Sequence, residues 1–263
     1  MNILEYMSVG ENEKPLDRIA TDGGFFSIFR TVACVGDSLS SGEFESKKPD
    51  GTKGYHDYYE YSWGQFMARS AGNTVYNFSR GGMTAKVYME SFAQEHGFWD
   101  KDKAAQAYII ALGVNDIINQ GWDVGSIDDI DVNDWRNNKQ TFAGYYAQII
   151  QRYKEIQPRA KFFLVAMPRH NNEKDEKRKA VRDLLERLTK LFNRTYLIDL
   201  YTYAPVNDEA YAEKYRLGHM NAMGYILTAR MIESYIDYIV RTNMQDFNQV
   251  GFIGTDLYYN AED

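Results

Sequence analysis

Five short apolar segments alternate with longer amphipathic segments along this chain, and the alternation constrains the fold more than any other feature. The short segments are rich in β-branched and aromatic residues and nearly free of polar ones, as strands buried on both faces are. They are Thr31–Val35, Thr74–Phe78, Ala107–Leu112, Phe162–Met167 and Tyr196–Leu200. Strands joined through helices pair in parallel. We therefore predict an α/β fold, a three-layer α/β/α sandwich around a parallel sheet of about five strands.

The longer segments show the spacing of helices that bury one face. In the segment before Pro158, apolar residues recur at Tyr145, Ile149 and Tyr153, and the proline then ends the helix. The predicted helices are Ser62–Ser70, Thr84–Gln94, Thr141–Ile156, Glu176–Phe192 and Ala222–Val240. In sheets of this kind, ligands bind beyond the carboxyl ends of the strands.

Two regions stand outside the alternation. The segment Gly113–Asn138 is long and acidic, which favours a functional loop, but it lacks the ligand spacing of a calcium loop and predicts no metal site. We expect residues 1–30 to form an extension packed on the domain. Residues 31–242 would form the domain itself, and residues 243–263 a C-terminal strap or tail.

Composition excludes several classes of function. A net charge of −7 and a pI near 5.2 argue against a nucleic-acid surface, which needs clustered basic residues. Cys34 is the single cysteine, so no intrachain disulfide forms. No apolar run reaches the roughly 20 residues of a membrane span, and the first residues lack a secretory pattern. The expectation is a cytoplasmic protein without a membrane partner; the oligomeric state stays open.

Polar residues and glycines follow the first three predicted strands. Ser38 follows the first, Gly81 and Gly82 the second, and Asn115 the third. A serine there can act as a nucleophile, and backbone N–H groups or a side-chain amide can stabilise an oxyanion. Each feature also has a structural explanation: a helix cap, a tight turn or an Asx turn.

Four histidines are present, and one follows all five predicted strands. His56, His96 and His170 lie earlier, whereas His219 directly precedes the last helix. A histidine in that position can reach back to Ser38 and remove its proton as a general base.

Together these segments resemble the SGNH, or GDSL, hydrolase family. The resemblance spans about Thr31 to Val240 and rests on Gly36-Asp37-Ser38-Leu39, on Asn77, Ser79 and Gly82, and on Gly113-Val114-Asn115-Asp116 in that order. It implies a flavodoxin-like fold and a serine esterase without a cofactor. Ser38 would be the nucleophile and His219 the base, with Ser38, Gly82 and Asn115 forming the oxyanion hole.

The fourth block departs from the family pattern. The family has an aspartate three residues before the histidine, where this chain has Arg216, which cannot accept a hydrogen bond from the imidazole. Three explanations remain open: a Ser–His dyad held by a backbone carbonyl, a substitute acid, or an impaired enzyme. The candidate acids are Glu213, Asp208 and Glu209.

The segment Lys47–Tyr61 bears on the substrate. Its Tyr55, His56 and Tyr58 are candidates for binding a sugar, which favours an acetylated carbohydrate or another small ester as substrate; packing against the core or a subunit explains them equally. Two alternatives come from other classes. One is a non-catalytic carbohydrate-binding or scaffolding protein that retains the hydrolase fold. The other is a cofactor-binding flavodoxin-like domain, which leaves the second and third blocks unexplained.

Overall fold

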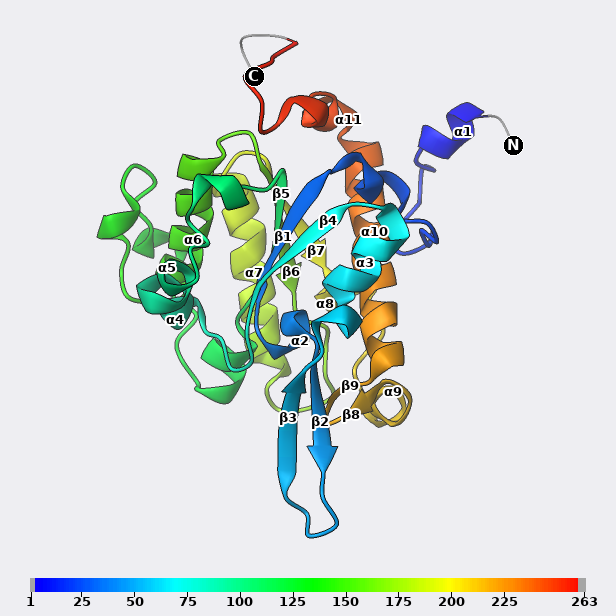
Figure 1. The fold of residues 1–263 in the computed structure, drawn as a ribbon, viewed down its shortest axis with the longest axis vertical. Coiled ribbons are helices and arrows are strands. Elements are labelled where there is room, and N and C mark those ends of the chain that lie inside the picture. Colours follow the sequence, from blue (N-terminus) through cyan, green and yellow to red (C-terminus); the bar gives the residue numbers. More distant parts are fainter. Residues whose placement is uncertain (1–2, 260–263) are drawn as a thin grey trace.

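A five-stranded parallel sheet forms the centre of the computed structural model, which describes residues 3–259 (Figure 1). Its strands are β1 (Thr31–Gly36), β4 (Thr74–Ser79), β5 (Ala107–Ala111), β6 (Lys161–Ala166) and β7 (Thr195–Asp199). Each coincides with a predicted strand to within one residue at either end. Every residue of β6 is buried, as expected for a central strand covered on both faces.

The order of the strands is β4-β1-β5-β6-β7, all in parallel. By position along the chain this is 2-1-3-4-5, the flavodoxin-like order, and the prediction of a three-layer α/β/α sandwich is confirmed. The direction of winding reverses between β1 and β5, and ligands bind at such a switch point. Gly36 pairs with Ser79 on one side and with Ala111 on the other, so three strands end together there.

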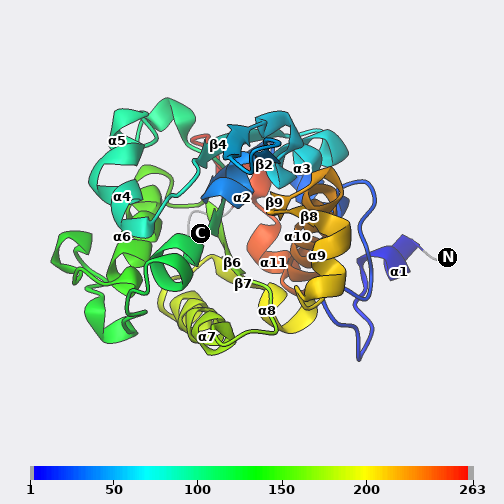
Figure 2. The ribbon, with the colours of Figure 1, turned by 90° about the horizontal axis from the view of Figure 1, so that it is seen from below.

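Helices cover both faces of the sheet, which makes three layers (Figure 2). Helices α6 (Phe142–Ile156) and α7 (Asp175–Leu191) lie on one face, and α3 (Trp63–Ala71) and α10 (Ala222–Thr242) on the other. Successive residues of β1 point to opposite faces, and each face carries its own apolar cluster. One cluster contains Ala33 and Val35, and the other contains Val32 and Cys34.

Local signals explain why the helices begin where they do. The side chains of Ser62, Thr141 and Asn221 accept hydrogen bonds from backbone N–H groups in the first turns of α3, α6 and α10. Gly72 ends α3 in the left-handed conformation, with φ of 72°. Among the described residues, no helix is long and apolar enough to cross a bilayer.

Two predicted segments are more irregular than expected. Thr84–Gln94 is divided into α4 (Ala85–Val87), a π-helical turn (Tyr88–Phe92) and α5 (Ala93–Glu95). The acidic segment after β5 contains a π-helical turn at Val114–Asn119 and 3₁₀ turns at Ile127–Asp129 and Trp135–Asn137.

Two hairpins at the carboxyl edge of the sheet were not predicted. The longer one pairs β2 (Glu43–Lys47) with β3 (Lys53–Asp57) and projects away from the sheet (Figure 1). The shorter one pairs β8 (Arg216–Leu217) with β9 (His219–Met220), directly after α9 (Glu209–Tyr215). The two hairpins pack together, with β2 of the longer one in contact with both β8 and β9 (Figure 2).

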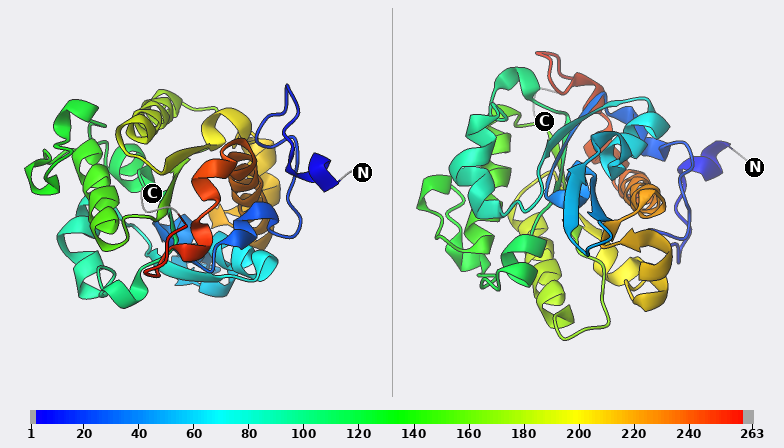
Figure 3. Two further views of the ribbon diagram at one scale, coloured as in Figure 1. Left: turned by 90° about the horizontal axis from the view of Figure 1, so that it is seen from above. Right: turned by 60° about the horizontal axis from the view of Figure 1, so that its bottom comes forward.

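The segments that follow β7 lie beside the sheet and at its amino edge. The segment that includes α8 (Leu200–Tyr203) leads from β7 toward α9. After α10, α11 (Met244–Phe247) and a 3₁₀ turn (Val250–Phe252) lie at the amino edge of the sheet (Figure 3). Gln106 donates hydrogen bonds to the carbonyls of Val250 and Ile253 there.

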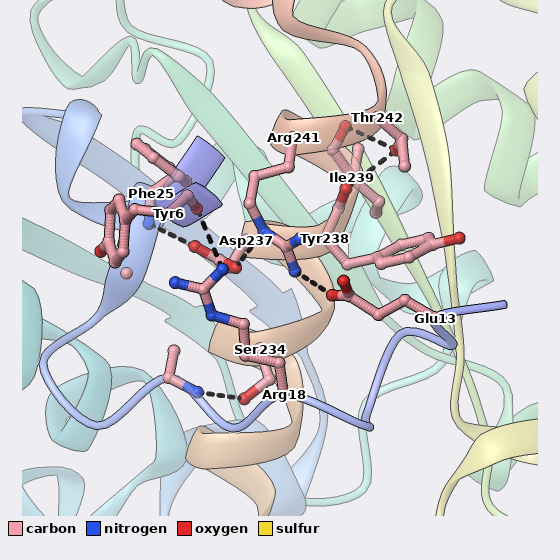
Figure 4. Close-up of polar contacts among 12 residues, drawn as sticks. Tyr6, Glu13, Arg18, Phe25, Ser234, Asp237, Tyr238, Ile239, Arg241 and Thr242 are labelled. Carbon is pink, nitrogen blue, oxygen red and sulfur yellow. Dashed lines mark hydrogen bonds and ion pairs between the residues drawn. The ribbon is translucent and has the colours of Figure 1, made fainter. Parts of the chain in front are cut away.

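The segment between α1 (Ile3–Met7) and β1 lies against α10 (Figure 4). Arg241 is 1% exposed and pairs with Glu13 at 2.6 Å and with Asp237 at 2.8 Å. It also donates a hydrogen bond to the carbonyl of Ser8, and Phe25 N–H donates to Asp237. One buried guanidinium therefore joins the N-terminal segment to the last long helix.

Replacement of Arg241 by alanine should destabilise the protein by about 3–5 kcal/mol, because Asp237 would remain buried without its partner. Urea unfolding measures the change. Arg136→Ala is the control, since its pair with Asp134 is exposed and should contribute less than about 1 kcal/mol. Equal effects of the two variants would contradict this account.

Candidate active site

Ser38 lies where β1 ends and the short helix α2 (Ser38–Ser41) begins, at the switch point of the sheet. The side chain of Asp37 caps this helix by accepting a hydrogen bond from Leu39 N–H at 3.0 Å. Gly36 is required because a Cβ atom there would lie 2.1 Å from Ser40 Oγ. The helix cap suggested by the sequence therefore exists, but it is formed by Asp37 and leaves the Ser38 hydroxyl available.

His219 approaches Ser38 from the other end of the chain. Its Nε2 lies 3.1 Å from Ser38 Oγ, within hydrogen-bonding distance. The β8–β9 hairpin holds the histidine, and Gly218 makes the turn with φ of 75°. Arg216 donates two hydrogen bonds to the carbonyl of Gly218, at 3.1 and 2.8 Å. The arginine found in place of the family's aspartate therefore braces the turn that carries His219.

Gly82 and Asn115 follow the strands on either side of β1. Gly82 has φ of 72°, and a Cβ atom there would meet nothing within 4 Å, so its surroundings are open. Asn115 Nδ2 donates to the carbonyl of Met83 at 3.0 Å, and Asn115 Oδ1 accepts from Asn119. These two contacts fix the amide, and the second proton on Nδ2 remains for a ligand.

The acids next to His219 come from β2, not from the segment before the histidine. Glu43 Oε1 lies 3.1 Å from His219 Nε2, and Glu45 Oε2 lies 3.7 Å from His219 Nδ1. Within residues 3–259, none of the predicted acids, Asp208, Glu209 and Glu213, forms an ion pair or hydrogen bond with His219. Asp208 caps α9 by accepting from Tyr211 N–H, and Glu209 and Glu213 lie on that helix.

Two glycines admit these carboxylates. A Cβ atom on Gly81 would lie 2.2 Å from Glu43 Oε2, and one on Gly218 would lie 2.1 Å from Glu45 Oε2. Two sequence signals point to the hairpin: the alternation through Glu43, Phe44 and Glu45, and the turn residues Pro49-Asp50-Gly51.

The two acids differ in their electrostatic surroundings. Burial raises the pKa of Glu43, with Asp57 and Glu45 adding to the effect, while His219 opposes it. The ion pair with Lys53, at 2.5 Å, lowers the pKa of Glu45, and His219 contributes in the same direction. Glu45 is therefore the better anchored negative charge beside the imidazole.

The three residues proposed to bind substrate separate onto two faces of the hairpin. Tyr55 pairs with Glu45 across the strands, and its exposed ring meets the His219 ring edge-on at 5.7 Å. His56 pairs with Phe44 instead and stacks on Tyr58, whose ring contacts Phe44. Only Tyr55 of the three lies at the serine–histidine pair.

The acidic segment after β5 is bonded internally. Asp129, for example, pairs with Lys139 at 2.9 Å and accepts a hydrogen bond from Thr141. Within residues 3–259, no three His, Cys, Asp or Glu side chains form a group that could hold a metal ion.

A serine and an imidazole at the switch point of this sheet are the arrangement of an SGNH-type ester hydrolase. Residues 34–227 match the GDSL-like lipase/acylhydrolase family, and the chain belongs to that family. No curated protein matches the sequence.

Solved structures with the same fold include several carbohydrate esterases. The family 2 carbohydrate esterase of Corynascus thermopiles (Myceliophthora fergusii) has a TM-score of 0.55 at 17% identity, over 80% of this chain and 66% of that one. A family 2 carbohydrate esterase of Clostridium thermocellum, in complex with cellohexaose, has a TM-score of 0.53 at 15% identity. The match covers 82% of this chain and 65% of that one. Est24, a carbohydrate acetylesterase from Sinorhizobium meliloti, has a TM-score of 0.53 at 16% identity. The match covers 80% of this chain and 99% of that one. These likenesses establish the fold.

Asp37 should make stability depend on pH. Burial raises the pKa of this carboxyl to about 7, with Asp116 adding to the effect. Between about pH 4 and 7 the folded state keeps a proton that the unfolded chain loses, so stability falls as the pH rises. Asp37→Asn keeps the cap and removes this loss. The variant should gain up to about 4 kcal/mol over the wild type across that window, at about 1.4 kcal/mol per pKa unit.

Urea denaturation at several pH values from 4 to 8 measures the difference between the Asp37→Asn variant and the wild type. The exposed Asp128, replaced by asparagine, is the control and should show no such trend. A constant difference for the Asp37 variant would contradict the buried, protonated state.

Proposed function

We propose that this chain is a serine esterase that removes small acyl groups, acetyl above all, from carbohydrate, with Ser38 as nucleophile and His219 as base. The observation that carries the proposal is the 3.1 Å separation between His219 Nε2 and Ser38 Oγ at the carboxyl edge of the sheet. Membership of an acylhydrolase family supports it independently.

The reaction proceeds through an acyl-enzyme. Ser38 Oγ attacks the ester carbonyl while His219 takes the hydroxyl proton and then delivers it to the departing alcohol. Water, activated by the same histidine, releases the acid in the second half. The Ser38 and Gly82 N–H groups and the Asn115 amide stabilise the oxyanion, each contributing about 3–4 kcal/mol in the transition state.

Glu45 is our candidate for the group that orients His219. It lies on the Nδ1 side of the ring at 3.7 Å, so a small rotation of the imidazole would bring a proton on Nδ1 to the carboxylate. That tautomer leaves the Nε2 lone pair free for the Ser38 hydroxyl. Glu43 approaches Nε2 itself and competes with Ser38 for it.

Carbohydrate is the favoured substrate class because of Tyr55. Tyr55 is 55% exposed, and its ring stands beside the histidine, where an aromatic face can pack on a sugar ring. The likeness to carbohydrate esterases agrees with this choice. A cytoplasmic location remains a prediction from the sequence.

The alternative is a carbohydrate-binding or scaffolding protein that has lost catalysis, and Arg216 motivates it. A fluorophosphonate probe separates the two functions, because it labels only an activated serine. Stoichiometric modification of Ser38 supports the esterase, and absence of labelling supports the alternative.

Ser38→Ala should lower kcat for a short-chain p-nitrophenyl ester by at least about 10³-fold, since the acyl-enzyme can no longer form. Ser46→Ala, on the exposed hairpin, is the matched control and should retain activity. A Ser38→Ala protein with the wild-type rate would overturn the proposal.

Glu45→Gln should lower kcat by about 10- to 100-fold with little change in KM, because the imidazole loses its orienting carboxylate. Glu43→Gln, two residues away on the same face of β2, should cost less. Steady-state kinetics of both variants provide the comparison. A larger loss for Glu43→Gln would assign the orienting role to Glu43.

A further inference from the structure

A cavity of about 260 Å³ lies beyond the ends of β5 and β6, next to the segment that carries the nucleophile. Asp37, Leu39 and Ser40, which flank Ser38 in the chain, form part of its wall. Asn119, the hydrogen-bond partner of Asn115, forms another part. The cavity therefore adjoins the chain on both sides of Ser38 and the neighbour of Asn115.

Most of the cavity wall is apolar. Its inner surface includes Leu112, Val165, Met167, Met220, Met231 and Ile232. Thioether and aliphatic side chains of this kind accommodate the carbon skeleton of a ligand without fixing its shape.

Two arginines line the same cavity, and the buried one, Arg178, forms no direct ion pair within residues 3–259. Arg178 is 6% exposed, and its hydrogen bond runs to the neutral side chain of Asn172 at 3.1 Å. No carboxylate of residues 3–259 lies within 4.0 Å of its guanidinium. Asp175 and Glu173 act on it only from farther away, and Asp175 accepts hydrogen bonds from the Tyr201 hydroxyl and from His170 N–H. A buried charge of this kind normally has an anionic partner.

Arg216 is the second arginine of the wall. Its Nε and Nη2 are bonded to the Gly218 carbonyl, which leaves donors on Nη1. His170, also in the wall, is neutral, because burial and then the charges of Arg178 and Arg216 lower its pKa to about 4. Asp37 is the one acid that lines the cavity, and its raised pKa leaves it partly protonated near neutral pH. The cavity thus carries net positive charge.

Further polar atoms in the wall lack partners. Ser40 is 1% exposed, and its hydroxyl has no hydrogen-bond partner within the described part of the chain. The same holds for Asn207 Oδ1, which belongs to the loop before α9. Buried polar atoms without partners are rare in folded proteins and often mark the place of a ligand.

We propose that this cavity binds a carboxylate carried by the ester substrate, with Arg178 and Arg216 holding the anion and the methionines packing on the carbon skeleton beside it. The inference rests on the proposed esterase function and specifies its substrate class. The charge can belong to the acyl group, as in a hemiester of a short dicarboxylic acid, or to the alcohol, as in an acetylated uronic acid.

Two pairs of matched substrates distinguish these sources. In the acyl arm, methyl hydrogen glutarate is compared with methyl pentanoate. In the alcohol arm, acetylated methyl glucuronoside is compared with acetylated methyl glucoside. Hydrolysis by the wild type is measured by pH-stat titration. In one of the two arms, kcat/KM should be at least about 10-fold higher for the anionic ester than for its neutral counterpart.

In Arg178→Gln and in Arg216→Gln, the ratio of kcat/KM for the anionic ester to kcat/KM for the neutral ester should fall toward one. Arg187→Gln is the control, because this arginine is exposed on α7 and lies outside the cavity. The preference is a ratio of two substrates on one protein, so a general loss of activity through the His219 turn does not affect it. A wild type that prefers the neutral ester, or treats both alike, in both arms overturns the inference.

A wild type that hydrolyses none of the four esters and is not labelled at Ser38 by the fluorophosphonate probe overturns the esterase proposal. Whenever none of the four esters is hydrolysed, the cavity is tested by binding. Calorimetric titration of the full chain with glutarate and with glucuronate provides that test. Saturable binding that weakens at least 10-fold in Arg178→Gln supports the anion site, and no binding of either anion overturns it.

Discussion

The parallel pairing of β1 with both β4 and β5 is the constraint on which the site depends. It aligns Gly36 with Ser79 and Ala111, so the chain leaves three adjacent strands at the same level. The segments that carry Ser38, Gly82 and Asn115 start from those ends. Reversal of the winding direction keeps the crossover helices apart and leaves a crevice there. Without that register these groups, and His219 some 181 residues beyond Ser38, would not converge.

Charge at this edge is separated into an acidic region and a basic region. On one side of His219, β2 brings Glu43 and Glu45, and glycines at positions 81 and 218 leave room for their carboxylates. On the other side, Arg178 and Arg216 face the cavity. The arginine occupies the position where the family has an acid, and the acids have come from a hairpin instead. Negative charge therefore lies beside the imidazole although the family's aspartate is absent.

Burial changes the protonation of the polar groups near the strand ends. Asp37 caps the helix of the nucleophile but lies away from water, so its carboxyl holds a proton unusually well. The same loss of solvent lowers the pKa of His170 and leaves Arg178 buried without a directly bonded carboxylate. Apolar clusters on both faces of the sheet produce this environment, because they exclude water from the strand ends while the site itself stays open at the hairpin.

The sequence by itself determined the five strands, the four long helices that cover the sheet and the order in which the polar residues leave the sheet. Those features are encoded locally, in runs of apolar residues and in caps such as Ser62 and Thr141. The tertiary structure decided which acid meets His219 and which side of the hairpin faces it. A five-residue strand such as β2 carries a weak signal, and Glu45 meets the histidine only because two hairpins distant in sequence pack together. The cavity of Arg178 and Arg216 likewise exists only in the folded chain, since its walls come from β5, β6, α7, the β8–β9 hairpin and α10.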